Sequence, residues 1–310
     1  MARGGQVTED EATAPRRRPS RRSVLIAGAS GLGLAGVAAG AATGVLPVSE
    51  AVQRVLGVAS SSPATQLGAA RVERVWSHYR NRMVDLVTLL PTKSPPRNLP
   101  MSLLLHGLRG RARTAAPTGS LNELASQVAR KRTRPYGFVA VDGGDNYWHE
   151  NIPGDDPMGM LLEEVPQWLR ERGLGGTDGL PFACTGMSMG GFGSLLYARR
   201  RAERRQPVSA LALLAPALML SWTEMAKRRA FHDEADWASM DPLRNPTATA
   251  GVPTAVWCGT EDAFISGARR FIATTRPEIG YTARGKHGDS FNRTVVPSMV
   301  GFLGRHRPTP

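Results

Sequence analysis

The sequence predicts an α/β fold in which a mostly parallel sheet is covered by helices on both faces. From Arg80 onward, short apolar runs alternate with longer segments whose apolar residues recur at helical spacing. Most of the apolar runs carry no charge, which is typical of strands buried on both faces of a parallel sheet. Residues 60–310 are expected to form this domain, with its functional groups at the carboxyl ends of the strands.

The first half of the domain is expected to supply three strands and two helices. The strands are predicted at 83–91, 101–107 and 136–142. A helix near 121–131 is indicated by Ser120-x-x-Glu123, a capping-box pattern in which side chains accept hydrogen bonds from the first free N–H groups. A second helix is expected at 158–173, where leucine and valine recur at helical spacing.

The second half continues the same alternation. Strands are predicted at 181–186, 208–216 and 252–259, and helices at about 189–204, 266–275 and 293–304. Strands that alternate with helices in this way favour parallel pairing, because each helix provides the crossover to the next strand.

Residues 1–59 are predicted to lie outside this domain. Gly31, Gly33 and Gly36 match G-x-G-x-x-G, which would make this segment the phosphate loop of a nucleotide-binding fold. However, residues 34–46 carry no charge, whereas a helix that covers a sheet needs a polar face. The twin arginine of SRRSVL (20–25), ahead of an apolar stretch, resembles instead a signal for the twin-arginine export machinery.

Two forms of the export signal stay open. Residues 23–49 contain no Asp, Glu, Lys or Arg and are long enough to span a bilayer, so the segment can serve as a membrane anchor. Alternatively, small residues ending at Ala51 or Ala59 provide a cleavage site. In both forms the protein is expected to be exported, as a secreted protein or one associated with the membrane or cell envelope.

The composition limits the partners and cofactors. The chain has 39 basic and 26 acidic residues, a formal charge of +13, but its basic residues form no stripe interleaved with aromatics, and no nucleic-acid-binding motif is present. Nucleic acid is therefore not an expected partner. Cys184 and Cys258 lie in apolar strand-like runs and are expected to be free and buried. No cluster has metal-ligand spacing, so neither a metal nor a cofactor is expected.

The strand at 181–186 runs directly into the motif G-M-S-M-G-G. A helix-compatible segment follows Gly190 and Gly191 without a spacer. This order of strand, turn and helix is typical of a nucleophile elbow, in which flanking glycines allow a strained turn that raises the serine above the sheet. Ser188 is therefore the candidate nucleophile.

A serine hydroxyl needs a base, and in this type of fold the acid and the histidine follow the serine in the chain. Asp262 closes G-T-E-D after the strand at 252–259, and His287 stands just before the last helix. His287 is expected to take the proton from Ser188, while Asp262 orients the imidazole. Glu261 is the competing acid.

The oxyanion of a tetrahedral intermediate needs preorganised N–H donors. The backbone amide of Met189 follows the nucleophile directly, and the amide of Leu108 lies in the glycine-rich turn after the strand at 101–107. These two amides are the candidate oxyanion hole. His106, which starts this turn, is expected to have a structural role.

These motifs resemble the esterase D branch of the α/β-hydrolases, which includes S-formylglutathione hydrolases and exported mycobacterial mycolyltransferases. The resemblance covers about residues 75–305 and rests on G-L-R after an apolar strand, S-M-G-G, G-x-x-D and a late H-x-x-x-F. It implies the α/β-hydrolase fold and the catalytic residues Ser188, Asp262 and His287. Two departures concern specificity. Arg109 stands where S-formylglutathione hydrolases have a cysteine, and Asp262 stands where mycolyltransferases use a glutamate.

The segment VDGGDNYWHE (141–150) is a candidate wall of the substrate pocket. It leaves a buried strand at the catalytic face and carries Tyr147, Trp148 and His149, and polar groups beside aromatics suit a sugar or a polar alcohol. The alternative is a loop packed by its own aromatic residues.

Arg109 and Trp222 complete the candidate substrate-binding residues. Trp222 belongs to segment 217–245, which is either a short lid over an acyl chain or part of the core.

The sequence therefore predicts an exported serine esterase that hydrolyses small-molecule or lipid carboxylic esters through an acyl-enzyme. One alternative is an acyltransferase that moves an acyl or mycolyl chain to a sugar or lipid alcohol, because it shares the first chemical step. An alternative of another class is a non-catalytic cell-envelope binding protein that has kept the fold.

Overall fold

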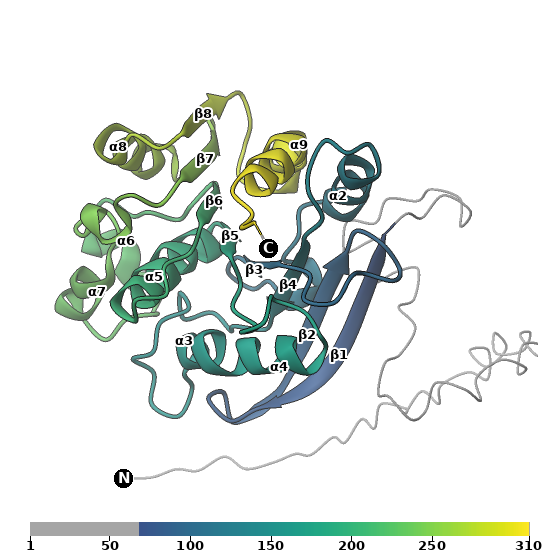
Figure 1. The fold of residues 1–310 in the computed structure, drawn as a ribbon. Coiled ribbons are helices and arrows are strands. Elements are labelled where there is room, and N and C mark those ends of the chain that lie inside the picture. Colours follow the sequence, from purple (N-terminus) through teal and green to yellow (C-terminus); the bar gives the residue numbers. More distant parts are fainter. Residues whose placement is uncertain (1–67, 310) are drawn as a thin grey trace, which may run out of the picture. The chain divides into compact units, whose positions relative to one another are not determined.

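The structure is a computed structural model that describes residues 68–309. Its centre is an eight-stranded sheet in the order β1-β2-β4-β3-β5-β6-β7-β8 (Figure 1). The strands are β1 Ala69–Ser77, β2 Arg82–Leu90, β3 Met101–Leu105, β4 Gly137–Val141, β5 Ala183–Met187, β6 Ala210–Leu214, β7 Thr254–Gly259 and β8 Ile279–Ala283. The pairs β1–β2 and β2–β4 are antiparallel and all others are parallel, which confirms the predicted fold class.

Helices cover both faces of the sheet (Figure 1). The α-helices are α2 Ser120–Ala129, α3 Pro157–Gly159, α4 Val165–Glu171, α5 Met189–Glu203, α6 Trp222–Ala226, α7 Glu234–Met240, α8 Ile265–Thr275 and α9 Asp289–Arg305. One hydrophobic cluster joins the sheet to α2 and α9, and a second joins the opposite face to α4, α5 and α8. Shorter helical turns are η2 Ala112–Thr114, η3 Met160–Glu164 and η4 Pro246–Thr249.

The two outermost strands have no counterpart among the predicted elements. Along β1, charged residues such as Arg71, Glu73 and Arg74 interrupt the apolar ones, and most of its residues are only partly buried. None of the residues of β8 is fully buried. Edge strands are wet on one side, so they lack the continuous apolar run that identifies a central parallel strand.

The prediction of a capping box at Ser120 is wrong. The residue that caps α2 is Gly119, in a left-handed conformation with φ 90°, and no side chain caps the helix. The hydroxyl of Ser120 donates to the carbonyl of Pro117 at 2.7 Å, and Glu123 accepts from the Gln127 side chain. Serine can bond to the turn before a helix as readily as to the helix itself, so the pattern shifts by one residue.

The helix predicted at 158–173 is present from 157 to 171, with a π-helical segment, η3, in its middle. Pro166 lies two residues after the end of η3. It has no N–H to donate, and its ring would collide with the carbonyl four residues earlier in a regular α-helix. A wider turn relieves that collision, which is one of the recognised causes of a π-segment.

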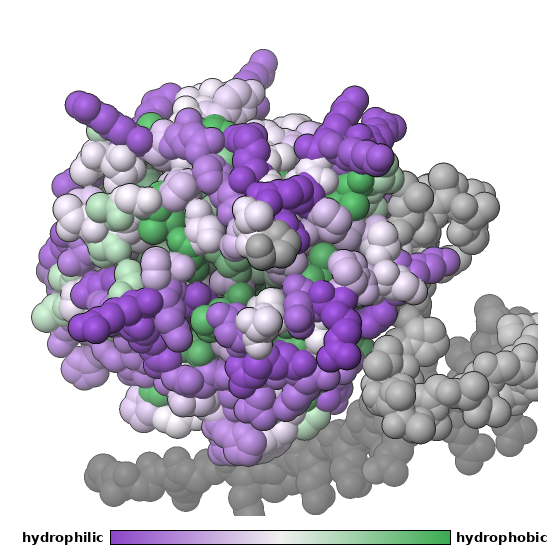
Figure 2. All heavy atoms as spheres, in the orientation of Figure 1, coloured by the Kyte–Doolittle hydropathy of each residue, from purple (hydrophilic) through white to green (hydrophobic). Residues whose placement is uncertain are grey.

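Several further properties concern residues 68–309. Cys184 and Cys258 are free and buried, as expected. Over this range no helix is both long and apolar enough to cross a membrane, and no group of three or more His, Cys, Asp or Glu is arranged to hold a metal ion. The face seen in Figure 2 is mainly hydrophilic, with hydrophobic residues in small groups between polar ones.

Candidate active site

Ser188 occupies a strained turn between β5 and α5. Its backbone has φ 57° and ψ −120°, a conformation that is unfavourable for a residue with a Cβ and persists only where the surroundings enforce it. A Cβ added at Gly186 would overlap the carbonyl of Gly190, and one added at Gly190 would overlap the carbonyl of Leu105. The glycines of the motif are therefore required by close backbone approach.

Backbone hydrogen bonds on both sides of Ser188 hold this turn. The N–H of Ser188 donates to the carbonyl of Leu214 at the end of β6, at 3.0 Å. The Ser188 carbonyl accepts from Gly191 and Ala217, both at 2.9 Å. Ser188 lies at the carboxyl end of β5 and is nearly buried, with 8% of its surface exposed.

Asp262 and His287 meet through a 2.8 Å hydrogen bond between Oδ2 of the aspartate and Nδ1 of the histidine. The other carboxylate oxygen of Asp262 accepts from the backbone N–H of Phe264, also at 2.8 Å. The Asp262 side chain is fully buried, while the His287 side chain is 34% exposed. Because Nδ1 donates to the carboxylate, the Nε2 atom of His287 is the one available to accept a proton.

Glu261, the competing acid, lies elsewhere. Its side chain is 41% exposed and pairs at 3.0 Å with Arg284, which is itself almost fully exposed. An ion pair this exposed does not hold a carboxylate in a fixed position, and Glu261 forms no hydrogen bond or ion pair with His287. The geometry therefore favours Asp262 over Glu261 as the partner of His287.

The turn after β3 presents the backbone amide of Leu108. Gly110 closes the turn by donating to the Gly107 carbonyl at 2.9 Å. Arg109 has φ 60°, and its N–H donates to Oδ1 of Asp145 at 2.6 Å. The amides of Leu108 and Met189 donate no hydrogen bond to any group within residues 68–309, so both are available to an oxygen atom.

His106 supports this turn, as expected. Its Nδ1–H donates to the Gly107 carbonyl at 2.8 Å, and its Nε2 accepts from the N–H of Gly143 at 2.9 Å. The ring is 1% exposed, and burial lowers the pKa of His106, so the neutral tautomer is maintained. The indole N–H of Trp148 donates to the His106 carbonyl at 3.2 Å.

Tyr147, Trp148 and His149 were expected at the rim of a substrate pocket, but the structure buries them. All three are at most 1% exposed. The Tyr147 ring packs against Phe192 and Phe231, at centroid distances of 5.3 and 5.9 Å. The aromatic side chains contribute more by burial in the core than at a wet rim, and they pack against residues outside the loop rather than against one another.

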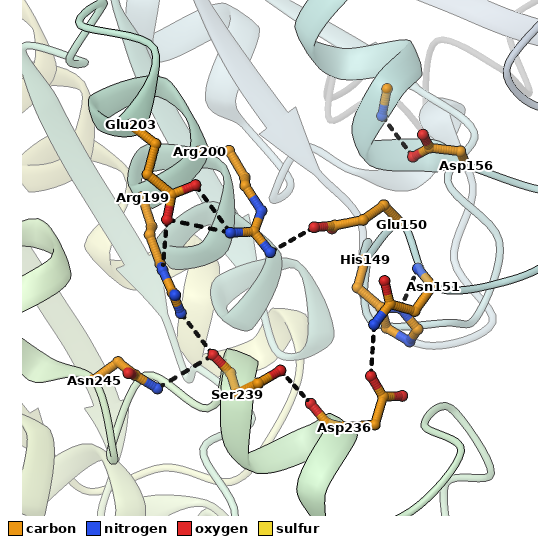
Figure 3. A network of polar contacts seen from close by, with 11 residues as sticks. His149, Glu150, Asn151, Asp156, Arg199, Arg200, Glu203, Asp236, Ser239 and Asn245 are labelled. Atoms are coloured by element: carbon orange, nitrogen blue, oxygen red, sulfur yellow. Dashed lines mark hydrogen bonds and ion pairs between the residues drawn. The ribbon is translucent and has the colours of Figure 1, made fainter.

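His149 belongs to a polar network that joins this loop to segment 217–245 (Figure 3). Its Nε2–H donates to the Ala230 carbonyl at 2.5 Å, and its Nδ1 accepts from the N–H of Asn151 at 3.0 Å. The Asn151 side chain donates to Asp236 of α7 at 2.6 Å. Burial lowers the pKa of His149 and keeps it neutral. These hydrogen bonds hold segment 217–245 against the loop that follows β4.

The remaining two candidates lie nearer to solvent. Arg109 is exposed directly after Leu108 in the turn. Trp222, at the start of α6, is partly buried against the core, and its ring lies 6.1 Å from that of Trp237. Asp145 belongs to segment 141–150, which was expected at the catalytic face, but its bond to the N–H of Arg109 was not predicted. An aspartate in a glycine-rich loop is common, and this acceptor role depends on a neighbouring loop.

Comparison with known proteins gives one family and many similar structures. The family model described as "Putative esterase" matches residues 77–267. No curated protein matches the chain in sequence. An S-formylglutathione hydrolase from Agrobacterium tumefaciens is 15% identical, with a TM-score of 0.59 over 79% of this chain and 98% of that one.

Two further structures are similar at the same level. FphF, a fluorophosphonate-binding serine hydrolase of Staphylococcus aureus, is 15% identical, with a TM-score of 0.56 over 76% of this chain and 98% of that one. MPT51 of Mycobacterium tuberculosis is 17% identical, with a TM-score of 0.55 over 77% of this chain and 100% of that one. At these identities the likeness concerns the fold.

Proposed function

From the premise that this chain belongs to the esterase family and has the α/β-hydrolase fold, we propose that it hydrolyses carboxylic esters through an acyl-enzyme on Ser188. The proposal rests on two observations: the strained backbone of Ser188 at the carboxyl end of β5, and a buried Asp262 that is hydrogen-bonded to His287. A turn of this kind is unfavourable for folding alone, and such strain concentrates at functional sites.

In the proposed first step, Nε2 of His287 takes the proton of Ser188 as its Oγ attacks the ester carbonyl carbon. The carbonyl oxygen becomes an oxyanion and accepts hydrogen bonds from the Leu108 and Met189 amides. Asp262 stabilises the imidazolium through its bond to Nδ1. As the intermediate collapses, His287 gives the proton to the departing alcohol, and the acyl group stays on Ser188.

In the second half-reaction, His287 removes a proton from a water molecule that attacks the acyl-enzyme, and the carboxylic acid leaves as Ser188 recovers its proton. An acyltransferase differs only here, because a sugar or lipid alcohol takes the place of water. Product analysis with added alcohol separates the two. Ester products at the expense of acid would favour transfer, and acid alone at high alcohol concentration would exclude it.

The test of the nucleophile uses p-nitrophenyl esters of short and medium chain length, together with a fluorophosphonate probe that labels activated serines. The protein is expected to turn over the esters and to be labelled once, and Ser188→Ala is expected to lose both properties. Ser298→Ala, on the exposed side of α9, is the matched control. A folded protein that neither turns over nor labels would favour a non-catalytic, envelope-binding role.

We also propose export, on the strength of the twin arginine in residues 20–25, which lie outside the described residues. The expected result is that replacing Arg21 and Arg22 by lysine retains the protein in the cytoplasm. Unchanged secretion or membrane attachment of that variant would contradict this assignment.

A further inference from the structure

A groove of about 860 Å³ lies at the amino-terminal ends of the central strands, whereas Ser188 lies at their carboxyl ends. Its walls come from the loops that precede β3, β5 and β6 and from the residues after α9. The strand β5 runs from the groove to Ser188, and parallel strands rise about 3.3 Å per residue. The two sites are therefore separated by roughly 20 Å. The groove is therefore distinct from the candidate active site.

Arg201, on the last turn of α5, forms part of the groove wall and is 3% exposed. Its Nη1 donates to the Pro181 carbonyl at 3.1 Å and to the Tyr197 hydroxyl at 2.7 Å. Its Nε is enclosed and has no hydrogen-bond partner, and within residues 68–309 no carboxylate forms an ion pair with this guanidinium. A buried charge without a counter-ion is unfavourable, because dipoles alone replace little of its lost hydration.

Two more arginines line the same groove. Arg307 has an enclosed Nε without a partner, and its Nη1 donates only to the carbonyl of Pro308, at 3.1 Å. Burial and repulsion from Arg134 lower the pKa of Arg307, so its charge is poorly compensated. Arg97 is exposed on the facing loop. Among the described residues, neither Arg97 nor Arg307 forms an ion pair with a carboxylate.

One acidic residue, Asp178, also lines the groove, and one of its oxygens accepts from the N–H of Leu180 at 2.9 Å. The groove wall therefore carries three positive side chains and one negative. We propose that this groove binds a ligand that bears a phosphate group, with Arg97, Arg201 and Arg307 as its donors. Phosphate fits this set better than a carboxylate, since it offers enough oxygens for several guanidinium groups at once.

The test is calorimetric titration of the full chain with inorganic phosphate at constant ionic strength, beside the variants Arg307→Gln and Arg97→Gln. Each variant is expected to weaken binding roughly tenfold, because each removes a charge-assisted hydrogen bond. Arg269→Gln, on the exposed side of α8, removes the same charge elsewhere and is expected to bind like the parent. Equal weakening in Arg269→Gln, or no binding by the parent chain, would overturn the proposal.

Arg201→Gln is the sharper variant, and circular dichroism first establishes whether it folds. If it folds, it should lose phosphate binding most completely; if it does not, Arg307→Gln decides. Ser188→Ala should bind phosphate unchanged, which separates this site from the esterase reaction. A loss of binding in Ser188→Ala would place the phosphate at the active site and overturn the proposal.

The phosphate can be a free anion or a lipid headgroup, and vesicles distinguish these sources. Phosphatidylglycerol vesicles that bind the parent chain but release Arg307→Gln would identify a headgroup. Binding of inorganic phosphate alone would identify a free anion. Vesicle binding that is the same for parent and variant, without phosphate binding, would show only general adhesion and contradict the proposal.

Discussion

Two segments at the carboxyl ends of the strands contain residues with a positive φ, and they place the side chains of those residues differently. At the turn after β5, Ser188 has φ 57° and keeps 8% of its surface exposed. In the loop after β4, Tyr147 and Trp148 have φ 56° and 68°, and both are buried. A positive φ is unfavourable for a residue with a Cβ, and the surrounding structure decides whether its side chain faces the core or the surface.

The difference teaches that the two segments serve one site in different ways. The loop after β4 supports the turn after β3, because Asp145 holds Arg109 while Gly143 and Trp148 hold His106. We expect the Ser188 turn to carry the chemistry and the loop after β4 to maintain the geometry. Substitutions in the first should therefore abolish turnover at little cost in stability. Substitutions in the second should mainly lower stability and should affect turnover only through the position of the turn after β3.

The largest expected effect is that of Ser188→Ala. It removes the proposed nucleophile and should lower kcat/KM by roughly three orders of magnitude or more. Its Tm should change by no more than a few degrees, because only one oxygen atom is lost and the rest of the side chain keeps its packing. Ester hydrolysis and thermal unfolding of the same preparation measure both. A large fall in Tm would show that this turn also has a structural role and would remove the contrast.

Asp262→Asn comes next. The amide cannot stabilise the imidazolium and favours the wrong tautomer of His287, so kcat should fall by roughly two to four orders of magnitude. Glu261→Gln is the matched control, since it removes a charge one residue away, from a solvated ion pair. Its kcat should stay within about twofold of the parent. If instead Glu261→Gln is the more damaging, the acid has been misassigned.

The central strands and the Ser188 turn could be predicted because their residue types follow from geometry. Buried parallel strands require uninterrupted apolar runs, and a backbone contact such as that of Gly190 with Leu105 admits only glycine. The edge strands β1 and β8 lack such a run. The prediction failed for Trp148 because a tyrosine, tryptophan or histidine beside glycines has the same composition at a wet rim as in a packed loop.

Trp148→Ala tests the supporting loop. Its ring is fully buried against Gly143 and Gly193, so truncation should lower the free energy of unfolding by about 3–5 kcal/mol. Urea denaturation measures the loss. Exposed Trp76, which is 46% exposed on β1, gives the matched control, and Trp76→Ala should cost less than about 1 kcal/mol. Similar losses for the two variants would contradict the burial argument.

Asp145 should act on catalysis by positioning. Asp145→Ala frees the N–H of Arg109 and loosens the turn that presents Leu108, so kcat should fall about tenfold while KM changes little. Asp145→Asn keeps an acceptor oxygen and should restore most of the loss. Equal damage from both variants would mean that the carboxylate charge, rather than the hydrogen bond, is what matters.

The smallest expected effect concerns pH. Burial lowers the pKa of His106 and His149 below the ordinary value near 6.5 of an unfolded chain. The unfolded state therefore binds more protons, so stability is fully present above about pH 6.5 and declines as the pH falls toward the folded values. Urea unfolding at pH 8, 7, 6 and 5 should show this slope, and His149→Gln should make it shallower.

Asp241 changes stability with pH in the opposite direction to the two histidines, so a variant at this position helps to identify the groups responsible. Burial raises the pKa of Asp241 to about 6, so the folded state binds the extra proton between about pH 4 and 6, and stability from this group increases as the pH falls. Asp241→Asn should therefore steepen the acid loss that His149→Gln reduces. Since Asp241 lies at the end of α7, away from the turn after β3, its substitution should leave kcat unchanged at neutral pH. If His149→Gln also leaves the acid slope unchanged, the loop after β4 is not the element that loses stability in acid.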